Sequence, residues 1–438
     1  MTPAKEGVHR MSHIPAGIVA AAVLCGATLS LSAQGAGDKY WPQWRGPSAT
    51  GVSPSANPPI EWAENKNVRW KIELPGRGAS TPVIWGDRLY LSTAVPVNGT
   101  GQRAQHQFLV MAVNRKDGRI VWQHKVKEEA PHEGTHQDFG TMASPSAVTD
   151  GEHVIASFES RGIYAVDMNG KLVWQADLGD KRMRNEFGEG SSPALYKDKL
   201  FVVWDHQGES FIAALNKRTG AELWRTKRDE IDSWATPLVV EAGGKAQVIT
   251  GAMRRVRAYD ADTGQVVWET AGLTMNPIPS PVGEDGIVIA TSGFRGNNLK
   301  AIRIADATGD LTGSNAIVWS LDRDTPYVPS PVLYDGFLYL LKSNSPILSV
   351  FDAKTGKPHY QLQRLDGLGS EVFSSPVGAA GRVYITGRDG TTLVLRNGGT
   401  FEVLAKNVLD DGFDASPALV DGEMYMRGYR YLYSLGAK

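Results

Sequence analysis

Residues 132–136, HEGTH, place two histidines around a glutamate with the H-E-x-x-H spacing of zinc proteases. That chemistry needs both imidazoles one helical turn apart on the same helix face, so that they bind one Zn²⁺. Here Pro131 precedes the motif, Gly134 lies inside it and strand-like runs flank it, so we expect no helix. We interpret the stretch as a loop whose histidines bond neighbouring backbone. The alternative is that His132 and His136 bind a structural metal.

A second set of chemically capable residues is scattered along the chain. It combines carboxylates, an amide, an imidazole, a guanidinium and two aromatic rings, which are groups that anchor polar ligands and protein partners. Its members are His136, Glu189, Trp234, Asn276, Arg295, Tyr327 and Asp414. The competing interpretation is a set of solvated loops whose ion pairs contribute little. The choice depends on whether the fold brings these residues together.

The elements that would position them form a repeat, and each copy begins with Ser-Pro or Thr-Pro. The first residues of these dipeptides are Thr81, Ser144, Ser192, Thr236, Ser280, Ser330, Ser375 and Ser416. After most copies come an apolar run, a tight Gly- or Asp-containing hairpin, a second and a third run, and a turn such as DADTG (260–264). A closing run follows and ends in an aromatic residue, namely Trp122, Trp174, Trp224, Trp268, Trp319 or Tyr360. Four strand signals every ~45 residues are typical of a propeller blade.

The predicted fold is therefore all-β, an eight-bladed β-propeller of four-stranded antiparallel blades. The eighth copy ends after three strands, whereas NVRWKIEL (67–74) has the pattern of a closing strand with no blade before it. We expect this N-terminal strand to complete the last blade and close the ring. Because one blade cannot bury both of its faces, we expect the closing tryptophans to pack between neighbouring blades.

The loops that lead into the eight Ser/Thr-Pro copies share one face of such a propeller with the loops between the second and third strands. The innermost strands start at this face, so the residues before them converge on the mouth of the central channel. This face collects the second set of residues, whereas the opposite face carries mainly Gly- and Lys-containing turns. We predict a ligand- or partner-binding site at the channel mouth, with Trp234 and Arg295 as anchors.

The stretches AYDADTGQVVW (258–268) and AALNKRTGAELW (213–224) resemble the repeat of pyrroloquinoline-quinone (PQQ) propellers. YWPQWRGP (40–47) and PYVPSPV (326–332) look like parts of an exported bacterial PQQ-like family. The resemblance implies an eight-bladed PQQ-like β-propeller over residues 65–438. It points to two groups of proteins, the quinoprotein dehydrogenases and non-enzymatic propellers similar to the outer-membrane assembly protein BamB.

For a quinoprotein, the resemblance implies a Trp against a planar cofactor, Glu and Asn oxygens on Ca²⁺, and an Asp as base. Glu189, Trp234 and Asn276 occur in that order, and Asp322 or Asp324 is a candidate base. These dehydrogenases also carry a vicinal disulfide and are generally longer, whereas the mature chain would contain no cysteine. We expect no cofactor, and PQQ with Ca²⁺ only under the alternative function.

The first 33 residues have the pattern of a secretory signal peptide. Lys5 and Arg10 precede an apolar stretch at 14–33, which holds Cys25, the one cysteine of the chain, and small residues follow it. We expect cleavage, and the alternative is a retained N-terminal anchor. Residues 34–64 form a Pro- and Trp-rich lead-in segment, which we expect to pack along the side or bottom of the ring through its tryptophans. The alternative is that it docks a partner.

The charge balance limits the partners. With a net charge of −1, the chain lacks the positive excess that nucleic acids or anionic membranes attract. We predict a monomer without a transmembrane span after signal cleavage, periplasmic or secreted. It would act as a binding or scaffold module in cell-envelope protein assembly, and its partner would be an envelope protein or a small polar ligand at the channel mouth. The alternative is a PQQ- and Ca²⁺-dependent alcohol or sugar oxidoreductase.

Overall fold

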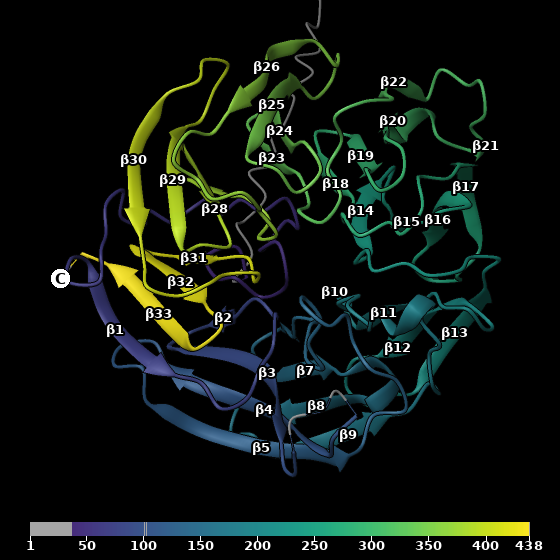
Figure 1. The fold of residues 1–438 in the computed structure, drawn as a ribbon. Coiled ribbons are helices and arrows are strands. Elements are labelled where there is room, and N and C mark those ends of the chain that lie inside the picture. Colours follow the sequence, from purple (N-terminus) through teal and green to yellow (C-terminus); the bar gives the residue numbers. More distant parts are fainter. Residues whose placement is uncertain (1–36, 100, 102, 438) are drawn as a thin grey trace, which may run out of the picture. The chain divides into compact units, whose positions relative to one another are not determined.

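The computed structural model describes residues 37–99, 101 and 103–437, and residues 35–438 form one compact unit. Eight sheets stand around a central axis in this unit (Figure 1), which confirms the all-β, eight-bladed propeller. Helical structure in the described residues is limited to the 3₁₀ turns η1 (Glu159–Arg161), η2 (Arg184–Glu186) and η3 (Ile304–Asp306). None of these described helices is long and apolar enough to span a membrane. The predicted signal peptide lies outside the described residues.

The first four blades follow one another along the chain, each ordered from the channel outward. Blade 1 contains β2 (Val83–Trp85), β3 (Arg88–Pro96), β4 (His106–Asn114) and β5 (Ile120–Glu129). Blade 2 contains β6 (Val148–Thr149), β7 (His153–Ser157), β8 (Ile163–Asp167) and β9 (Leu172–Ala176). Blade 3 contains β10 (Ala194–Tyr196), β11 (Lys199–Trp204), β12 (Phe211–Asn216) and β13 (Glu222–Lys227). Blade 4 contains β14 (Leu238–Ala242), β15 (Lys245–Gly251), β16 (Arg255–Asp260) and β17 (Val266–Ala271), with β21 (Gly309–Asp310) added in parallel outside β17.

The last four blades continue in the same order. Blade 5 contains β18 (Val282–Glu284), β19 (Ile287–Ser292), β20 (Asn298–Arg303) and β22 (Ile317–Leu321). Blade 6 contains β23 (Val332–Tyr334), β24 (Phe337–Leu341), β25 (Ile347–Asp352) and β26 (Pro358–Arg364). Blade 7 contains β27 (Val377–Ala379), β28 (Arg382–Thr386), β29 (Thr391–Arg396) and β30 (Val403–Val408). Blade 8 contains β31 (Ala418–Val420), β32 (Glu423–Arg427), β33 (Tyr431–Gly436) and, outermost, β1 (Val68–Glu73).

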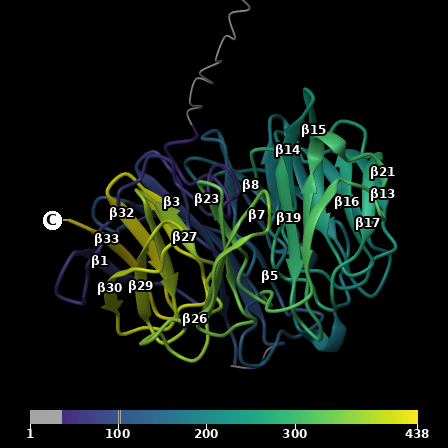
Figure 2. The ribbon, with the colours of Figure 1, turned by 90° about the horizontal axis from the view of Figure 1, so that it is seen from above.

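The last blade is completed from the N-terminal part of the chain, as predicted. β1 pairs antiparallel with β33, with Trp70 opposite Ser434 and Ile72 opposite Leu432. In Figure 1 the purple β1 lies beside the yellow β33, and β33 is again next to β1 when the ring is turned by 90° (Figure 2). β2 contacts both β6 and β31, so the first blade meets the last and the ring is closed.

Hydrogen bonds between neighbouring blades explain the Ser/Thr-Pro repeat. The backbone N–H of Ser330 donates to Oγ of Ser375 at 2.9 Å, and the N–H of Ser375 donates to Oγ of Ser416 at 3.0 Å. The same bond joins the pairs Thr81–Ser146, Ser146–Ser192, Ser192–Thr236, Thr236–Ser280 and Ser280–Ser330. Each of these hydroxyls accepts a buried N–H that has no strand partner, except that of Thr81. We call these eight residues the hydroxyl ring.

One member of the hydroxyl ring differs from the expectation. In blade 2 the ring residue is Ser146, not Ser144 of the Ser144-Pro145 dipeptide. The carbonyl oxygen of Pro145 accepts a hydrogen bond from Ser92, and Ser144 instead exchanges a hydrogen bond with Thr141 in its own loop. The dipeptide therefore lies two residues before the position that it was expected to mark.

The closing tryptophans pack between blades in a specific way. The indole N–H of Trp174 donates to the carbonyl oxygen of Lys217 in the next blade, at 2.8 Å. A Cβ built on Gly220, whose φ is +71°, would lie 2.5 Å from that indole, so the turn must carry glycine. The same indole-to-carbonyl bond and glycine contact occur at Trp70, Trp122, Trp224 and Trp319. Trp268 is the exception, because it bonds Gln247 of its own blade and lies opposite Gly309 of β21.

The lead-in segment packs along the ring, which is the first of the two arrangements expected from the sequence. Trp41 pairs with Ile84 of blade 1, Val52 bridges to Gly378 of blade 7, and Ala63 bridges to Val408 at the outer edge of blade 7. Between these contacts the guanidinium of Arg45 donates to the carbonyl oxygens of Pro376 and Pro331, at 2.7 and 2.5 Å. Burial without a carboxylate lowers the pKa of Arg45 to about 9. The segment therefore links blades 1, 6 and 7 across the channel.

Candidate functional site

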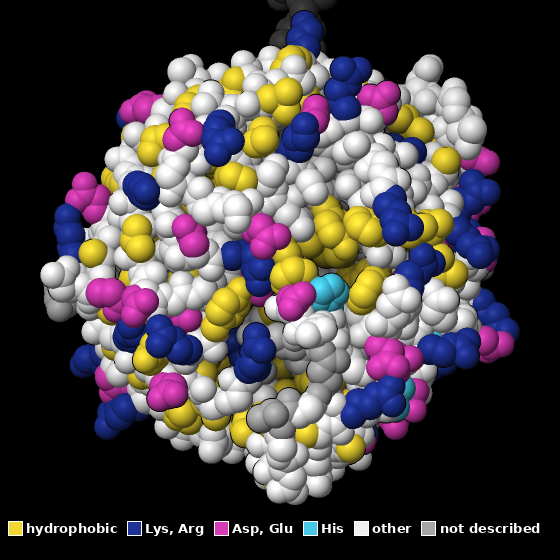
Figure 3. Space-filling view, viewed as in Figure 1, with side chains coloured by type: hydrophobic (Ala, Val, Ile, Leu, Met, Phe, Trp, Pro, Cys, Tyr) yellow, Lys and Arg dark blue, Asp and Glu magenta, His cyan; other side chains and the backbone are white. Residues whose placement is uncertain are grey.

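A cavity of about 480 Å³ lies at the channel mouth, where the lead-in loops meet. Six of the seven predicted site residues line it, and each comes from the loop before a different innermost strand. They are His136, Glu189, Trp234, Asn276, Tyr327 and Asp414. Figure 3 shows apolar side chains gathered near the centre of this face, with a histidine and acidic and basic side chains beside them. A role in binding remains a prediction for each of these residues.

Aromatic rings form most of the cavity wall. His136 stacks on Phe139, with ring centroids 4.6 Å apart, and lies 5.2 Å from Phe187. Its Nδ1 accepts the N–H of Asp138, as expected for a loop histidine that bonds its own backbone. On another part of the wall, Phe294 stacks on Tyr327 at 4.7 Å. Stacked rings hold one another in place, so the wall is largely preformed.

Arg388 connects the aromatic wall to the acidic side of the mouth. Its guanidinium carbon lies 4.7 Å from the ring centre of Phe139 and 4.4 Å from that of Phe373. The same group donates to Asp414 and Glu371, both at 2.8 Å, and these carboxylates raise the pKa of Arg388 against the opposing effect of burial. The arginine is thus fixed between two aromatic rings and two carboxylates.

Glu189 lines the cavity but is already engaged. One carboxylate oxygen accepts the N–H of Ser160 at 2.9 Å, and the other accepts Arg161 Nη1 at 2.6 Å. Behind this pair, the buried Glu159 binds Lys181 at 2.6 Å. Burial raises the pKa of Glu159 to about 7, and the charge of Glu189 adds to the effect, although Lys181 opposes it. The two ion pairs form one interior cluster beside the cavity.

The remaining polar groups of the wall are also paired within the protein. The indole N–H of Trp234 donates to the carbonyl oxygen of Gly188 at 2.8 Å, which leaves the ring face as its free surface. Asn276 is buried in a left-handed conformation, with φ +51°. Burial raises the pKa of Tyr327, while the neighbouring Asn276 side chain acts in the opposite direction.

The hydroxyl ring and the lead-in segment form the deep end of the cavity. Ser146, Ser192, Thr236, Ser375 and Ser416 of the ring line it. Trp44 lines it as well, and together with Pro193 and Pro237, which directly follow ring residues, it also lines a second, smaller cavity. The lead-in segment therefore closes the channel on the side opposite the mouth, and the cavity has a floor.

Arg295 does not line the cavity, although sequence reasoning makes it an anchor. It is exposed in the turn between β19 and β20, with φ +50°. Its guanidinium carbon lies 5.5 Å from the ring centre of Phe294, on the outer side of the wall. Arg427, at the end of β32, is buried and donates to Ser80 and to the carbonyl oxygen of Ser92. Burial lowers the pKa of Arg427 to about 9.

The residues suggested for a quinone and Ca²⁺ converge, but they do not fit this pair. Ca²⁺ requires free carboxylate and amide oxygens. Both oxygens of Glu189 already accept hydrogen bonds, one of them from the guanidinium of Arg161. Neither candidate base lines the cavity, since Asp322 is exposed and Asp324 pairs with Lys342 at 2.9 Å. The cation that neutralises Glu189 is thus part of the protein itself.

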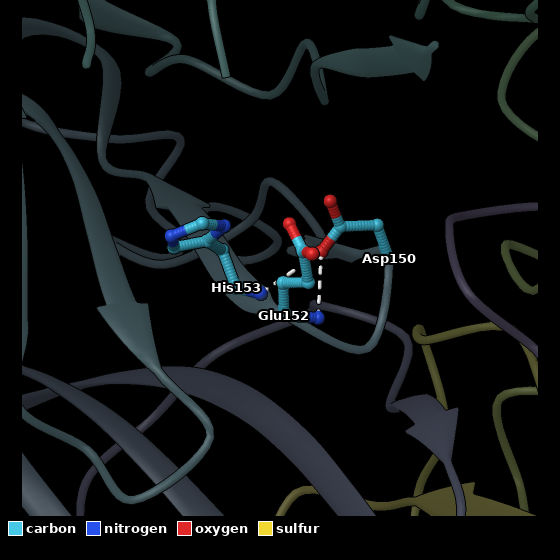
Figure 4. Close-up of side chains that lie close together, drawn as sticks. All are labelled: Asp150, Glu152 and His153. Atoms are coloured by element: carbon cyan, nitrogen blue, oxygen red, sulfur yellow. Dashed lines mark hydrogen bonds between the residues drawn. The ribbon is translucent and has the colours of Figure 1, made fainter. Parts of the chain in front are cut away.

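Two possible metal-binding groups are explained by local contacts. HEGTH forms a bend followed by irregular loop rather than a helix, and His132 Nε2 hydrogen-bonds the carbonyl oxygen of Lys181. Asp150, Glu152 and His153 cluster at the hairpin between β6 and β7 (Figure 4). There Asp150 accepts the backbone N–H groups of Glu152 and His153, while Lys217 and Arg218 of blade 3 pair with the two carboxylates. This cluster fastens two blades together.

Sequence reasoning missed most of the aromatic wall. Phe139, Phe187 and Phe373 line the cavity and lie in lead-in loops, and Phe294 lies in the turn that carries Arg295. A signal was present, because an aromatic residue precedes the ring hydroxyl by a few positions in most copies, as Phe373 precedes Ser375. In a sequence, such residues look like ordinary core positions, and only ring closure turns their faces toward a common centre.

A model of the family described as outer membrane protein assembly factor BamB matches residues 60–213 and 208–428. The outer membrane protein assembly factor BamB of Yersinia pestis is 26% identical over 262 residues, which are 56% of this chain and 60% of that protein. The chain thus spans about 60% of the length of this curated relative. The tetrathionate hydrolase of Acidithiobacillus ferrooxidans is 22% identical over 414 residues, covering 84% of this chain and 78% of that protein.

Among solved structures, the quinohemoprotein alcohol dehydrogenase of Comamonas testosteroni superposes with a TM-score of 0.64 and 13% identity. The superposition covers 93% of this chain and 82% of the dehydrogenase, and at this identity it reflects the shared fold alone. The family match, in contrast, covers most of the propeller. The chain therefore belongs to the family of PQQ-like β-propellers described as outer membrane protein assembly factor BamB.

Proposed function

We propose that the chain is an exported binding or scaffold module, which docks an envelope protein or a small polar ligand at the channel mouth during cell-envelope protein assembly. One observation carries the proposal. Six side chains of the types that bind ligands come from six different blades and line one cavity with a floor. A concave, largely apolar site with a few fixed polar groups is the usual form of a binding pocket.

The pairing of the polar groups favours binding over catalysis. Glu189, Asp414 and the Trp234 indole each have a partner within the protein, so they hold the shape of the cavity before a ligand arrives. A nucleophile would need a hydroxyl hydrogen-bonded to a base. Within the described residues, the hydroxyls that line the cavity have no hydrogen bond to a histidine ring.

The assembly role comes from the family. The Yersinia pestis relative is named an outer membrane protein assembly factor, and its match covers part of each protein. The signal-like pattern of residues 1–33 supports export to the compartment in which such a factor would work.

Capture from envelope extract tests the proposal. The parent chain should retain a partner, and the variant Trp234→Ala should bind it more than tenfold more weakly, about 1.4 kcal/mol. The control is Thr263→Ala on the opposite face, which should bind like the parent. Loss of the partner by the control variant, with binding intact in Trp234→Ala, would move the site to the other face.

A quinoprotein oxidoreductase is the second candidate. It is favoured only by the convergence of Glu189, Trp234 and Asn276 on one cavity. Adding PQQ and Ca²⁺ to the purified chain and assaying dye-linked oxidation of alcohols and sugars tests it. A bound chromophore together with turnover would make the oxidoreductase the better reading.

A further inference from the structure

We infer that the cavity at the channel mouth binds a small organic cation, specifically a tertiary or quaternary ammonium group on an apolar body. The inference rests on the proposed function, since it names the class of ligand for the same site. It follows from the aromatic wall, from the charges around that wall and from the way its polar groups are already used.

The wall offers ring faces to a ligand from several directions. Phe187, Trp234, Tyr327 and Phe373 reach the cavity from the lead-in loops of four blades. The Trp234 N–H is bonded to Gly188, so the indole meets a ligand through its face. The face of an aromatic ring is negative, and several such faces around one space attract a cation more strongly than a neutral group of the same size.

The protein already places a cation on this wall. The guanidinium of Arg388 stands between Phe139 and Phe373, within 5 Å of both ring centres. Arg295 covers the outer side of Phe294 in a similar way. Among the described residues, no Lys or Arg stands over Phe187, Trp234 or Tyr327, so no cation of the protein competes for these rings, although Phe294 covers one face of Tyr327.

The charges of the site have the matching sign. Glu189, Glu371 and Asp414 line the cavity, and no Lys or Arg of the described chain belongs to the lining. Arg161 pairs with Glu189, and Arg388 pairs with both Glu371 and Asp414, so these five groups together carry one net negative charge, while Arg295 lies outside Phe294. Glu371 is the most accessible of the three carboxylates, with its side chain 43% exposed. The charges of the lining therefore favour a cation over an anion.

The hydrogen bonds that the lining groups already make determine which kind of cation the cavity can bind. A primary ammonium group needs three acceptors when it is buried. Here both oxygens of Glu189 already accept hydrogen bonds, and Arg388 donates to one oxygen of Asp414 and to one oxygen of Glu371, which leaves few acceptors for three N–H groups. A quaternary ammonium group has no N–H to satisfy, so it can leave water for this wall without losing hydrogen bonds. At about 480 Å³, the cavity has room for such a group together with an apolar body.

Isothermal titration calorimetry on the full-length chain tests the inference, with choline as the probe. The neutral control is 3,3-dimethylbutan-1-ol, which has the same shape without the charge. Choline should bind, and the neutral alcohol should bind at least tenfold more weakly. Equal affinities would overturn the cationic class while leaving a binding cavity intact, so this failure is distinct from failure of the proposed function. No heat with choline in a chain that unfolds cooperatively would also overturn the inference.

Variants distinguish the effect of an aromatic face on choline binding from the effect of side-chain size alone. Phe187→Leu keeps an apolar side chain but removes the aromatic face, and it should abolish the preference for choline over the neutral alcohol. Glu371→Gln should weaken choline binding several-fold and reduce its dependence on salt. The matched control Phe401→Leu changes an aromatic residue that packs on Tyr360 away from the cavity, and it should bind choline like the parent. A preference that survives in Phe187→Leu contradicts the role of the wall.

A further arm addresses the source of the cation. N-acetyl-arginine amide mimics a basic side chain of a partner protein and carries many N–H donors. It should bind much more weakly than choline. If it binds and choline does not, the site recognises a basic side chain of a polypeptide, and the assignment to a small ammonium compound fails.

Discussion

Thr81 donates its side-chain hydroxyl to the backbone carbonyl oxygen of Ser416 at 3.0 Å, across 335 positions of the sequence. All the other contacts of the hydroxyl ring run from a backbone N–H to the next hydroxyl, and this one closes the circle in the reverse sense. The first and last blades are therefore joined at the channel as well as at the outer edge, where β1 pairs with β33.

Removing one acceptor from the hydroxyl ring should destabilise the protein. Ser375→Ala leaves the buried N–H of Ser330 without a partner, which costs about 1–3 kcal/mol. The neighbouring Ser374 is an internal control, because its buried hydroxyl has no partner and Ser374→Ala should be neutral or slightly stabilising. Urea denaturation compares the two. Equal stabilities would show that the ring bonds contribute nothing measurable.

The indole–glycine contacts should be equally sensitive. In Gly220→Ala the new methyl group lies 2.5 Å from Trp174 and the backbone has φ +71°, so both clash and strain apply. The control Gly336→Ala has φ +78° and open space, and only the strain of ~1–2 kcal/mol applies. Gly220→Ala should cost a further ~1–3 kcal/mol for overpacking. Similar melting temperatures for the two variants would contradict the role of the indole.

Deleting residues 65–74 should open the ring. The deletion removes β1, exposes the edge of β33 and leaves Gly118 of blade 1 without the Trp70 indole. We expect most of the stability to be lost and the protein to aggregate, as followed by thermal unfolding and gel filtration. A truncated chain that melts like the parent would show that the stability of the ring does not depend on β1.

Glu159 should make stability depend on pH. Burial raises its pKa from 4.5 to about 7, so the folded chain holds a proton that the unfolded chain has already released. Between these values the folded state binds more protons, and stability therefore falls as the pH rises from about 4.5 to about 7. Urea denaturation across this range should show the fall in the parent and a flatter curve in Glu159→Gln. Parallel curves would argue against the shift.

Protein purified from a host that makes PQQ should carry no stoichiometric quinone. The reason is the Glu189–Arg161 ion pair, which occupies the carboxylate oxygens that Ca²⁺ would need. The absorption spectrum of the purified protein is the measurement. A quinone chromophore at one per chain would contradict the prediction and favour the oxidoreductase.

The ring of blades could be predicted because each blade has local sequence signals and these signals repeat along the chain. Turns such as Asp260–Gly264 and the closing tryptophans recur along the chain. The strand that contains Trp70 has no blade before it, and it therefore predicted the pairing of β1 with β33. The exact hydroxyl of blade 2 could not be read, because Ser144 and Ser146 are two positions apart and only the strand register distinguishes them.

The position of the candidate site could largely be predicted from the sequence, but the directions and partners of its side chains could not. Knowing that lead-in loops converge was enough to choose Glu189, Trp234 and Asp414. The direction of a loop side chain depends on backbone angles that the sequence does not specify, as at Arg295, which the turn directs to the outside of Phe294. The burial of Arg161 and Arg427 likewise depends on neighbours from other blades or loops.

The order of synthesis has a consequence for the pairing of β1 with β33. The lead-in segment and β1 are made before all the other strands, but their partners in blades 6, 7 and 8 are made last. Until β33 exists, the N-terminal strand has no edge to join, and Trp44 has no complete channel to close. Neither the cavity nor its floor can form while any blade is missing. An unfinished or truncated chain therefore lacks the cavity at which we propose that the protein binds.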